Sequence, residues 1–370
     1  MAELEIHKGF ALKKLGEELF HEFLIWAKKK SITVDYLFKD DTTILYLVNL
    51  FIEEREAEKK RESLRVSVDG FGQAKFEEQS LLKAFETVNS LNRVQLKNFG
   101  SKKQWGVVAK DDLQKLDPII EMKPSLFVTL SDKVCSFCGI EQVTVKCKEC
   151  NQESYCGTFC KTKAYETYHK VLCSKDLLGL IKSISKYGQW FIHFPLFICK
   201  IFARMVIENK TCWKQLESLS FLSGFKNARI NLHEWKSTYE QVSQVFEKES
   251  FSKFINFDDY IHLISILVIN VFAWYSENAT NKADKCLALF YPGSFFNHSC
   301  KPNCEYYFQE GSMYFISTET IKQGQEIFVT YIDNTKSYEE RKKSLQVYEF
   351  SCNCILCKHD IEQIKKDNCN

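Results

Sequence analysis

The pattern of apolar and polar positions changes several times along the 370 residues of the chain. Over residues 1–92 apolar side chains recur mostly at steps of three and four, as they do on one face of a helix. A second apolar run, at 44–52, leads into a charged stretch that is typical of a solvated helix face. The clearest periodic positions are Phe10, Leu12, Leu15, Leu19, Phe20, Phe23 and Leu24. We therefore predict an N-terminal helical region over residues 1–92.

Residues 93–134 have a different pattern, in which short apolar runs alternate with turns. The runs at 106–109 and 125–130 predict β-strands, because they are short and rich in β-branched residues. From residue 174 to about 290 the apolar spacing becomes helical again, with one helix starting at 177 and another predicted over 257–275. Two of these apolar runs are hydrophobic enough to raise the question of a membrane span. The run at 191–207 is broken by charged residues and a proline, and 261–275 is shorter than the ~20 residues that a span requires, so both predict buried helices.

Strands return in the last third of the chain. Residues 313–317 predict one strand, and 324–331 predict a turn that leads into another. In the second strand Ile327, Val329 and Tyr331 occupy alternate positions and so share one face. Helical and strand-rich segments thus follow one another in separate blocks, which predicts an α+β fold.

Composition narrows the possible functions. The net charge of +2 gives no general electrostatic basis for binding nucleic acid, so direct nucleic-acid binding is not expected. The first residues contain no apolar leader segment, and we expect a cytoplasmic or nuclear protein without a membrane anchor. In such a compartment the sixteen cysteines are better explained as metal ligands than as disulfides.

The spacing of cysteines predicts zinc sites. Eight ligand-type residues form four pairs, and each pair has the gap of two or three residues that lets a turn aim two side chains at one tetrahedral ion. These residues are Cys135, Cys138, Cys147, Cys150, Cys156, Cys160, His169 and Cys173. Eight ligands correspond to two zinc ions, whose binding would supply folding free energy to a segment with few apolar residues. A later cluster, Cys352, Cys354 and Cys357, lacks the fourth ligand that a structural zinc needs.

Three motifs occur in a fixed order in the last third of the chain: Asn297-His298-Ser299-Cys300, then the segment 324–331, then the cysteine cluster at 352–357. This order resembles the catalytic half of SET-domain protein lysine methyltransferases. With the cysteine block upstream, the chain resembles the SET-and-MYND-domain family. The resemblance implies a β-rich SET domain with parts at 93–134 and 271–340. It is split by a MYND zinc finger at 135–173 and a helical insert at 174–270, and a zinc-binding post-SET segment follows at 341–370.

The resemblance also implies a methyltransferase that uses S-adenosylmethionine and acts on lysines of histones or other proteins. Tyr331 would be the catalytic residue, and Tyr348 would line the lysine channel. The implied cofactor contacts are Trp105, Gly106, Asn270, Ser294, Asn297, His298, Tyr331 and Phe350. Two of them keep an alternative interpretation: Trp105 as a core residue, and Asn270 as a structural hydrogen-bonding group.

For the metals, the resemblance implies three zinc ions in all. One would be held by Cys135, Cys138, Cys156 and Cys160, and a second by Cys147, Cys150, His169 and Cys173. Cys300 would complete the third site with Cys352, Cys354 and Cys357. MYND fingers of the family typically bind proline-rich peptides. One departure from the family is Gln104, where a Gly-x-Gly turn would carry its first glycine, and it motivates the alternative of an inactive, zinc-dependent interaction adaptor.

Overall fold

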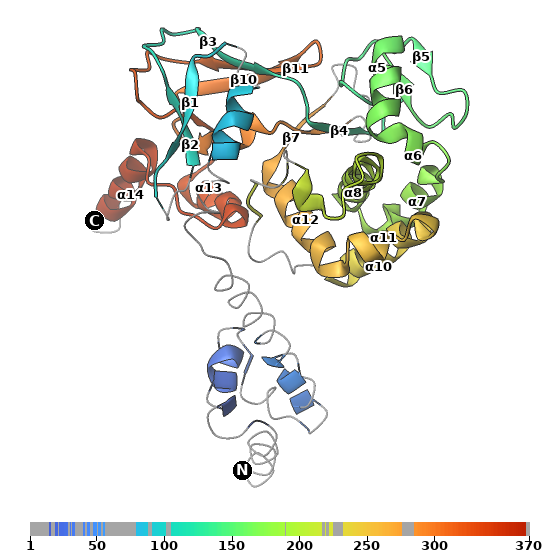
Figure 1. The fold of residues 1–370 in the computed structure, drawn as a ribbon. Helices are drawn as coiled ribbons and strands as arrows, with labels where there is room; N and C mark the ends of the chain where they lie inside the picture. Colours follow the sequence, from blue (N-terminus) through green and yellow to red (C-terminus); the bar gives the residue numbers. More distant parts are fainter. Residues whose placement is uncertain are drawn as a thin grey trace. The chain divides into compact units, whose positions relative to one another are not determined.

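The computed structural model describes most of the chain beyond residue 78 (Figure 1). The described residues are 79–87, 91–100, 105–188, 190–216, 219, 222–224, 232–275 and 285–367, with scattered residues between 15 and 55. Gln104, on which the adaptor alternative depends, lies outside them. The chain forms two compact units, Met1–Ser80 and Leu81–Asn370. Within the described parts, no helix has the length and apolar character needed to cross a membrane.

The first unit has its own small core. Its described residues are mainly helical, among them 22–28 and 47–49. The core side chains are Leu15, Phe23, Ala27, Ile44, Leu47, Val48 and Phe51. Of the positions with helical spacing in the sequence, Leu15, Leu19, Phe20, Phe23 and Leu24 do pack together, and Phe10 and Leu12 lie outside the described residues. Residues 81 and 85 were expected in the same region, but both side chains are buried in the core of the second unit, so the division falls at residue 80.

The second unit is organised around several small sheets (Figure 1). One antiparallel sheet pairs β1 (Val94–Asn98) with β2 (Trp105–Ala109). A second has the order β10 (Cys304–Gln309), β11 (Ser312–Ser317), β3 (Pro118–Met122). A third has the order β4 (Leu126–Thr129), β8 (Lys285–Leu289), β7 (Val271–Tyr275). Strands β3 and β4, which precede residue 130, thus pair with β11 and β8, which follow residue 270. The two parts of the α+β domain therefore pair with each other across the segment between them.

The segment between the halves begins with the cysteine-rich finger. It consists of the hairpin β5 (Val145–Lys146) and β6 (Ser154–Tyr155), then α5 (Thr158–Ala164), a π-helical turn η1 (Tyr165–His169) and α6 (Lys170–Leu172). These elements are short and contain few apolar side chains of their own. The finger instead packs through η1 and α6 against α8 (Trp190–Ile207) of the following insert.

The insert is helical, and α8 is its central helix (Figure 1). The remaining elements are α7 (Leu177–Ile184), η2 (Ser185–Tyr187), η3 (Trp213–Gln215), α10 (Leu232–Val245), η4 (Glu247–Glu249), α11 (Phe251–Phe254) and α12 (Phe257–Asn270). Helix α8 contacts α10, α12 and strand β4, and nearly all of its residues from 192 to 205 are buried. Phenylalanine rings fill its surroundings: Phe202 makes edge contacts to Phe246 and Phe251 at centroid distances of 5.1 and 4.9 Å. The run at 191–207 is therefore a buried helix, as predicted.

One prediction for the insert was wrong. The apolar run at 257–275 is not a single helix, because α12 ends at Asn270 and β7 continues as a strand paired with β8. The helix begins with a capping box in which the Asn256 side chain accepts from the Asp259 backbone and the Asp259 side chain accepts in return. The run is apolar on all faces, so periodicity could not reveal the change of structure. The strand segment is rich in aromatic and β-branched residues, which favour a sheet.

The last part of the chain brings distant motifs together. The 3-10 turn η6 (Pro292–Phe295) leads into β9 (Asn297–His298), which pairs in parallel with β12 (Phe328–Val329). Helix α13 (Tyr338–Ser344) starts at a capping box formed by Ser337 and Glu340. It continues through the 3-10 turn η7 (Leu345–Tyr348) towards α14 (Ile355–Asp367).

Candidate active site and metal centres

The parallel pairing of β9 with β12 brings Tyr331 beside His298. The backbone N–H of Tyr331 donates to Nδ1 of His298 at 3.0 Å, and the Tyr331 hydroxyl donates to the carbonyl of Phe296 at 2.6 Å. Because Nδ1 accepts, His298 carries its proton on Nε2, which lies 3.3 Å from Sγ of Cys300. Burial and the charge of Arg341 lower the pKa of His298 to about 4, so the ring is neutral at physiological pH.

Aromatic rings surround the Tyr331 side chain. The rings of Tyr331 and Tyr348 lie 4.9 Å apart, and the Phe350 ring lies 5.8 Å from His298 and 6.4 Å from Tyr331. Burial raises the pKa of Tyr331 above its usual value, and the nearby Tyr348 and Glu326 act in the same direction. The phenol therefore stays protonated at neutral pH. The predicted catalytic and channel residues are thus brought together, with Phe350 from the C-terminal segment beside them.

Tyr306, on β10, was not predicted from the sequence and also lies at this site. Its ring stacks on Phe315 at 5.4 Å and meets Phe272 edge-on at 5.1 Å. It is also close enough to Tyr331 and Tyr348 to raise the pKa of both phenols. The aromatic run around Tyr306 indicates only a strand, so no signal in the sequence set this tyrosine apart from Tyr307.

Asn297 is held at the start of β9 by two hydrogen bonds. Its amide nitrogen donates to the carbonyl of Trp105 at 3.1 Å and to Oε1 of Glu326 at 2.8 Å. Gly106 lies against the same group: a Cβ at this position would fall 2.6 Å from Nδ2 of Asn297 and 2.7 Å from Oε1 of Glu326. Only glycine fits there without displacing a neighbour, which explains why this glycine is needed. The Trp105 side chain is partly buried against the main core, as its alternative interpretation expected.

Two further polar residues support this corner and were missed. The Asn303 side chain donates to the carbonyl of Glu326 at 3.0 Å and accepts from the backbone N–H of Phe328 at 2.7 Å. Glu326 itself lies inside the predicted segment 324–331, in which only Tyr331 was given a role. A polar residue in an otherwise apolar strand is the signal that could have identified Glu326.

The other two predicted cofactor residues make local contacts. Ser294, in η6, donates to the carbonyl of Phe290 at 3.4 Å. Asn270 is buried, and its amide nitrogen donates to the carbonyls of Ser223 at 2.9 Å and Ile266 at 2.8 Å. These two bonds match the structural alternative for Asn270, since they satisfy the end of α12 and tie it to another segment, while its cofactor contact stays a prediction.

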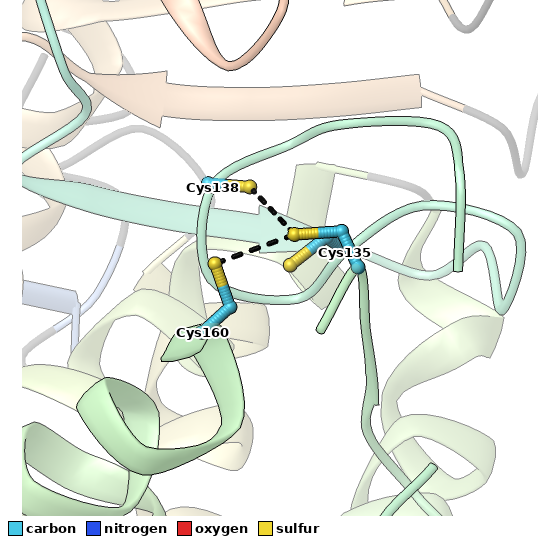
Figure 2. A group of neighbouring side chains, drawn as sticks. Cys135, Cys138 and Cys160 are labelled. Carbon is cyan, nitrogen blue, oxygen red and sulfur yellow. Dashed lines mark hydrogen bonds between the residues drawn. The ribbon is translucent and has the colours of Figure 1, made fainter. Parts of the chain in front are cut away.

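Two groups of metal-ligand side chains lie in the finger. In each group the four ligand atoms lie within 4.8 Å of one another. Figure 2 shows Cys135 and Cys138 pointing towards Cys160 of α5. The first group is Cys135, Cys138, Cys156 and Cys160, and the second is Cys147, Cys150, His169 and Cys173. These are the interleaved sets that the family resemblance implied, and a tetrahedral zinc ion fits each donor set.

A third group forms far from the finger in sequence. Cys300, Cys352, Cys354 and Cys357 also have their sulfur atoms within 4.8 Å of one another. The group joins the end of the Asn297–Cys300 motif to the C-terminal segment that carries Tyr348 and Phe350. Three cysteine-rich groups thus fit three zinc ions.

A buried arginine supports the third group. Nη2 of Arg341 lies 3.8 Å from Sγ of Cys357 and 2.6 Å from Oδ2 of Asp360. Four thiolates around one Zn²⁺ carry a net charge of −2, so a guanidinium beside them lowers the cost of burying that charge. Arg341 was missed because its motif, a charged helix face, indicates a solvated residue, whereas its side chain is only 4% exposed.

Comparisons with known proteins agree with this arrangement. The SET domain family model matches residues 104–332, which is more than half of the chain. A SET and MYND domain-containing protein of Dictyostelium discoideum is 29% identical over 273 residues, covering 67% of this chain and 77% of the relative. The N-lysine methyltransferase SMYD2-A of Xenopus laevis is 27% identical over 60% of this chain, and the histone-lysine N-methyltransferase SMYD3 of Mus musculus is 23% identical over 60%.

The chain matches about half the length of the two methyltransferases, 50% of SMYD2-A and 51% of SMYD3. The family match spans the strands on both sides of the finger and insert, and it includes the Asn297–Cys300 motif and Tyr331. Relatives named for both domains match the chain as well, and the finger holds the two four-ligand groups. The chain belongs to the SET-domain family, in its SET-and-MYND branch.

Proposed function

We propose that this protein transfers a methyl group from S-adenosylmethionine to the side-chain amine of a protein lysine. The observation that carries the proposal is the convergence of a buried, protonated tyrosine with the Asn297–His298 strand under a ring of aromatic side chains. The names of the matched methyltransferase relatives support the same reaction. When bound, the cofactor supplies a methyl group on a positively charged sulfur, which an amine attacks in line.

The residues of the chain contribute positioning. The Tyr331 hydroxyl donates its proton to the Phe296 carbonyl, so its oxygen is oriented to accept a hydrogen bond from the lysine amine. The rings of Tyr348 and Phe350 narrow the approach and exclude water, which favours the neutral amine that must attack. Asn297, fixed by Trp105 and Glu326, sets the polar edge of the cofactor site. Catalysis of this kind is mostly alignment of the reacting atoms.

The experiment compares cofactor binding with turnover. Zinc-loaded wild-type protein is expected to bind S-adenosylmethionine with micromolar affinity by calorimetry, and to transfer labelled methyl groups to lysine peptides on an array. Tyr331→Phe should bind the cofactor within about threefold of wild type but lose about 100-fold or more in turnover, since a positioned hydroxyl contributes roughly that much. Tyr307→Phe is the matched control, because Tyr307 stacks on Tyr314 on the exposed side of β10. Turnover by Tyr331→Phe at the wild-type rate, or no cofactor binding by the wild type, would refute the proposal.

We propose in addition that the finger binds a proline-rich peptide. Phe159 on α5 is 70% exposed and Tyr165 on η1 is 48% exposed, and exposed aromatic side chains are what proline-rich segments dock against. A fluorescent proline-rich peptide should bind the wild type and bind Phe159→Ala at least tenfold more weakly. We propose that the protein acts in the cytoplasm or nucleus, since eleven of the fifteen described cysteines lie in metal-ligand groups and none is in a disulfide.

A further inference from the structure

A cluster of buried charged and hydroxyl groups lies where the finger meets α8. Glu153, just before β6, is only 7% exposed. One carboxylate oxygen, Oε2, accepts from the Tyr155 hydroxyl at 2.7 Å and from the Tyr168 hydroxyl at 3.2 Å. The same oxygen lies 3.2 Å from Nδ1 of His169. The other oxygen lies 3.6 Å from Nζ of Lys200, so every polar neighbour of this carboxylate is a donor.

Lys200 comes from a different part of the fold. It lies on α8, in the middle of an apolar helix, and is 7% exposed. Its ammonium donates to the carbonyl of Phe127 on β4 at 2.9 Å and to the carbonyl of Ser136 at 3.0 Å. It also lies 4.1 Å from the centre of the Tyr168 ring, a cation–π contact. One side chain of the insert therefore contacts both the finger and strand β4.

Such a pair is expensive to bury. Removing an ammonium and a carboxylate from water costs several kcal/mol each, and apolar residues of similar size would often pack as stably. The Lys200 ammonium, the two tyrosine hydroxyls and the His169 ring all lie against the Glu153 carboxylate, an arrangement that favours its ionised form. Packing does not explain why these charges are present, whereas a need for orientation does.

His169 is the side chain whose orientation these charges can fix. Its Nε2 lies 3.6 Å from Sγ of Cys150 and so faces the second ligand group of the finger, while its Nδ1 faces Glu153. In metal sites a carboxylate that accepts from the second ring nitrogen fixes the tautomer and the direction of the imidazole. His169, Glu153 and Lys200 therefore form a continuous series of close polar contacts, which runs from the second ligand group to α8.

We propose that Glu153 is a positioning residue for the zinc ligand His169, and that Lys200 couples occupancy of this second zinc centre to the docking of α8 against the sheet formed by β4, β8 and β7. The inference rests on zinc binding by the finger. Because coupling between two sites is reciprocal, zinc stabilises the docked helix and the docked helix strengthens zinc binding. The finger would then act as a structural support whose metal holds the insert in place, in addition to any peptide that it binds.

The first test measures zinc release from the full chain into a chelating dye. Glu153→Ala should release one of its zinc ions about 10- to 100-fold faster than wild type, the usual effect of losing such a carboxylate, with the other two unchanged. Glu153→Gln should restore slow release, because its amide oxygen can still accept from Nδ1 of His169. Lys322→Met is the matched control, since Lys322 forms an exposed ion pair with Asp112. Wild-type release from Glu153→Ala would overturn the positioning role.

The second test is a double-mutant cycle read by hydrogen exchange in α8, residues 192–205. Cys147→Ser vacates only the second centre and should raise exchange in α8 at least tenfold. In the Lys200→Met background the same substitution should have less than a twofold effect, because the link is already broken. Equal effects in the two backgrounds would overturn the coupling. Metal analysis of the wild type separates this failure from failure of the zinc assignment, since a finger without zinc would show fewer than three ions per chain.

Discussion

Gly106 offers a direct test of the candidate cofactor site, because the space beside it is fully used. In Gly106→Ala the new methyl group would lie 2.6 Å from the Asn297 amide and 2.7 Å from the Glu326 carboxylate, against an ordinary contact of 3.4 Å or more. The Asn297 and Glu326 side chains would therefore have to move away from the new methyl group by almost 1 Å. The Phe99 ring, 2.9 Å away on the third side, prevents the methyl group from turning aside.

The expected magnitude follows from the hydrogen bonds that such a shift breaks. Asn297 donates to a neutral carbonyl and to a carboxylate; a neutral hydrogen bond contributes about 0.5–1.5 kcal/mol and one to a charged group about 1.5–3 kcal/mol. If cofactor binding requires Asn297 in its original place, the free energy of binding should become weaker by about 2–4 kcal/mol. Since 1.4 kcal/mol is a factor of ten, the Kd should rise roughly 30- to 700-fold.

The assay is calorimetric titration with S-adenosylmethionine on protein that has been checked for three zinc ions per chain. Gly157→Ala is the matched control: no atom lies within 4 Å of its Cβ position, and its backbone is extended. The control should bind like wild type. A Kd for Gly106→Ala within threefold of wild type would refute the reasoning, since it would mean that Asn297 can move without consequence for the cofactor.

Four further outcomes are expected. Asn270→Ala should lower the Tm by several degrees through loss of two backbone contacts, yet leave the Kd for S-adenosylmethionine within threefold; a large change in Kd would assign Asn270 to the cofactor instead. Cys300→Ser should reduce the zinc content from three ions to two by metal analysis and lower turnover sharply, and retention of three ions would exclude it as a ligand. Phe315→Ala, in the packed core, should destabilise the second unit by about 3–5 kcal/mol in denaturant unfolding, and a change below 1 kcal/mol would contradict the burial. Because the raised pKa of Tyr331 keeps its phenol protonated, turnover should rise with pH as the substrate lysine loses its proton and should show no fall up to pH 9.

The metal ligands were the most predictable part of the site. Pairs such as Cys135 with Cys138 are close in sequence, so their gaps carry the geometry of the turn that aims both side chains. Which four of the eight residues bind each ion does not follow from the spacing, and that assignment came from the family resemblance alone. The same holds for Cys300, which joins a group more than fifty residues away.

The supporting polar residues could not be predicted, for a common reason. Glu153, Lys200, Glu326 and Arg341 each act through a partner from another element, and a single sequence does not show which buried charge will meet which. Local patterns suggested the opposite for some of them, since a charge on a helix usually faces water. The strand at Val271–Tyr275 was missed for a different reason: all five of its residues are apolar or aromatic, so the sequence there has no polar positions to set a period.

The position of the finger and insert within the domain has a consequence for how the chain folds. Strand β4 pairs with β8, and the Asp117 backbone donates to the Ser317 side chain 200 residues further on. At synthesis rates of about 5–20 residues per second, β4 leaves the ribosome on the order of 10–30 s before its partner strand exists. The finger lies wholly within that interval and can fold on zinc first. The sheet formed by β4, β8 and β7 is therefore among the last parts to form, and contacts of such long range make its closure slow.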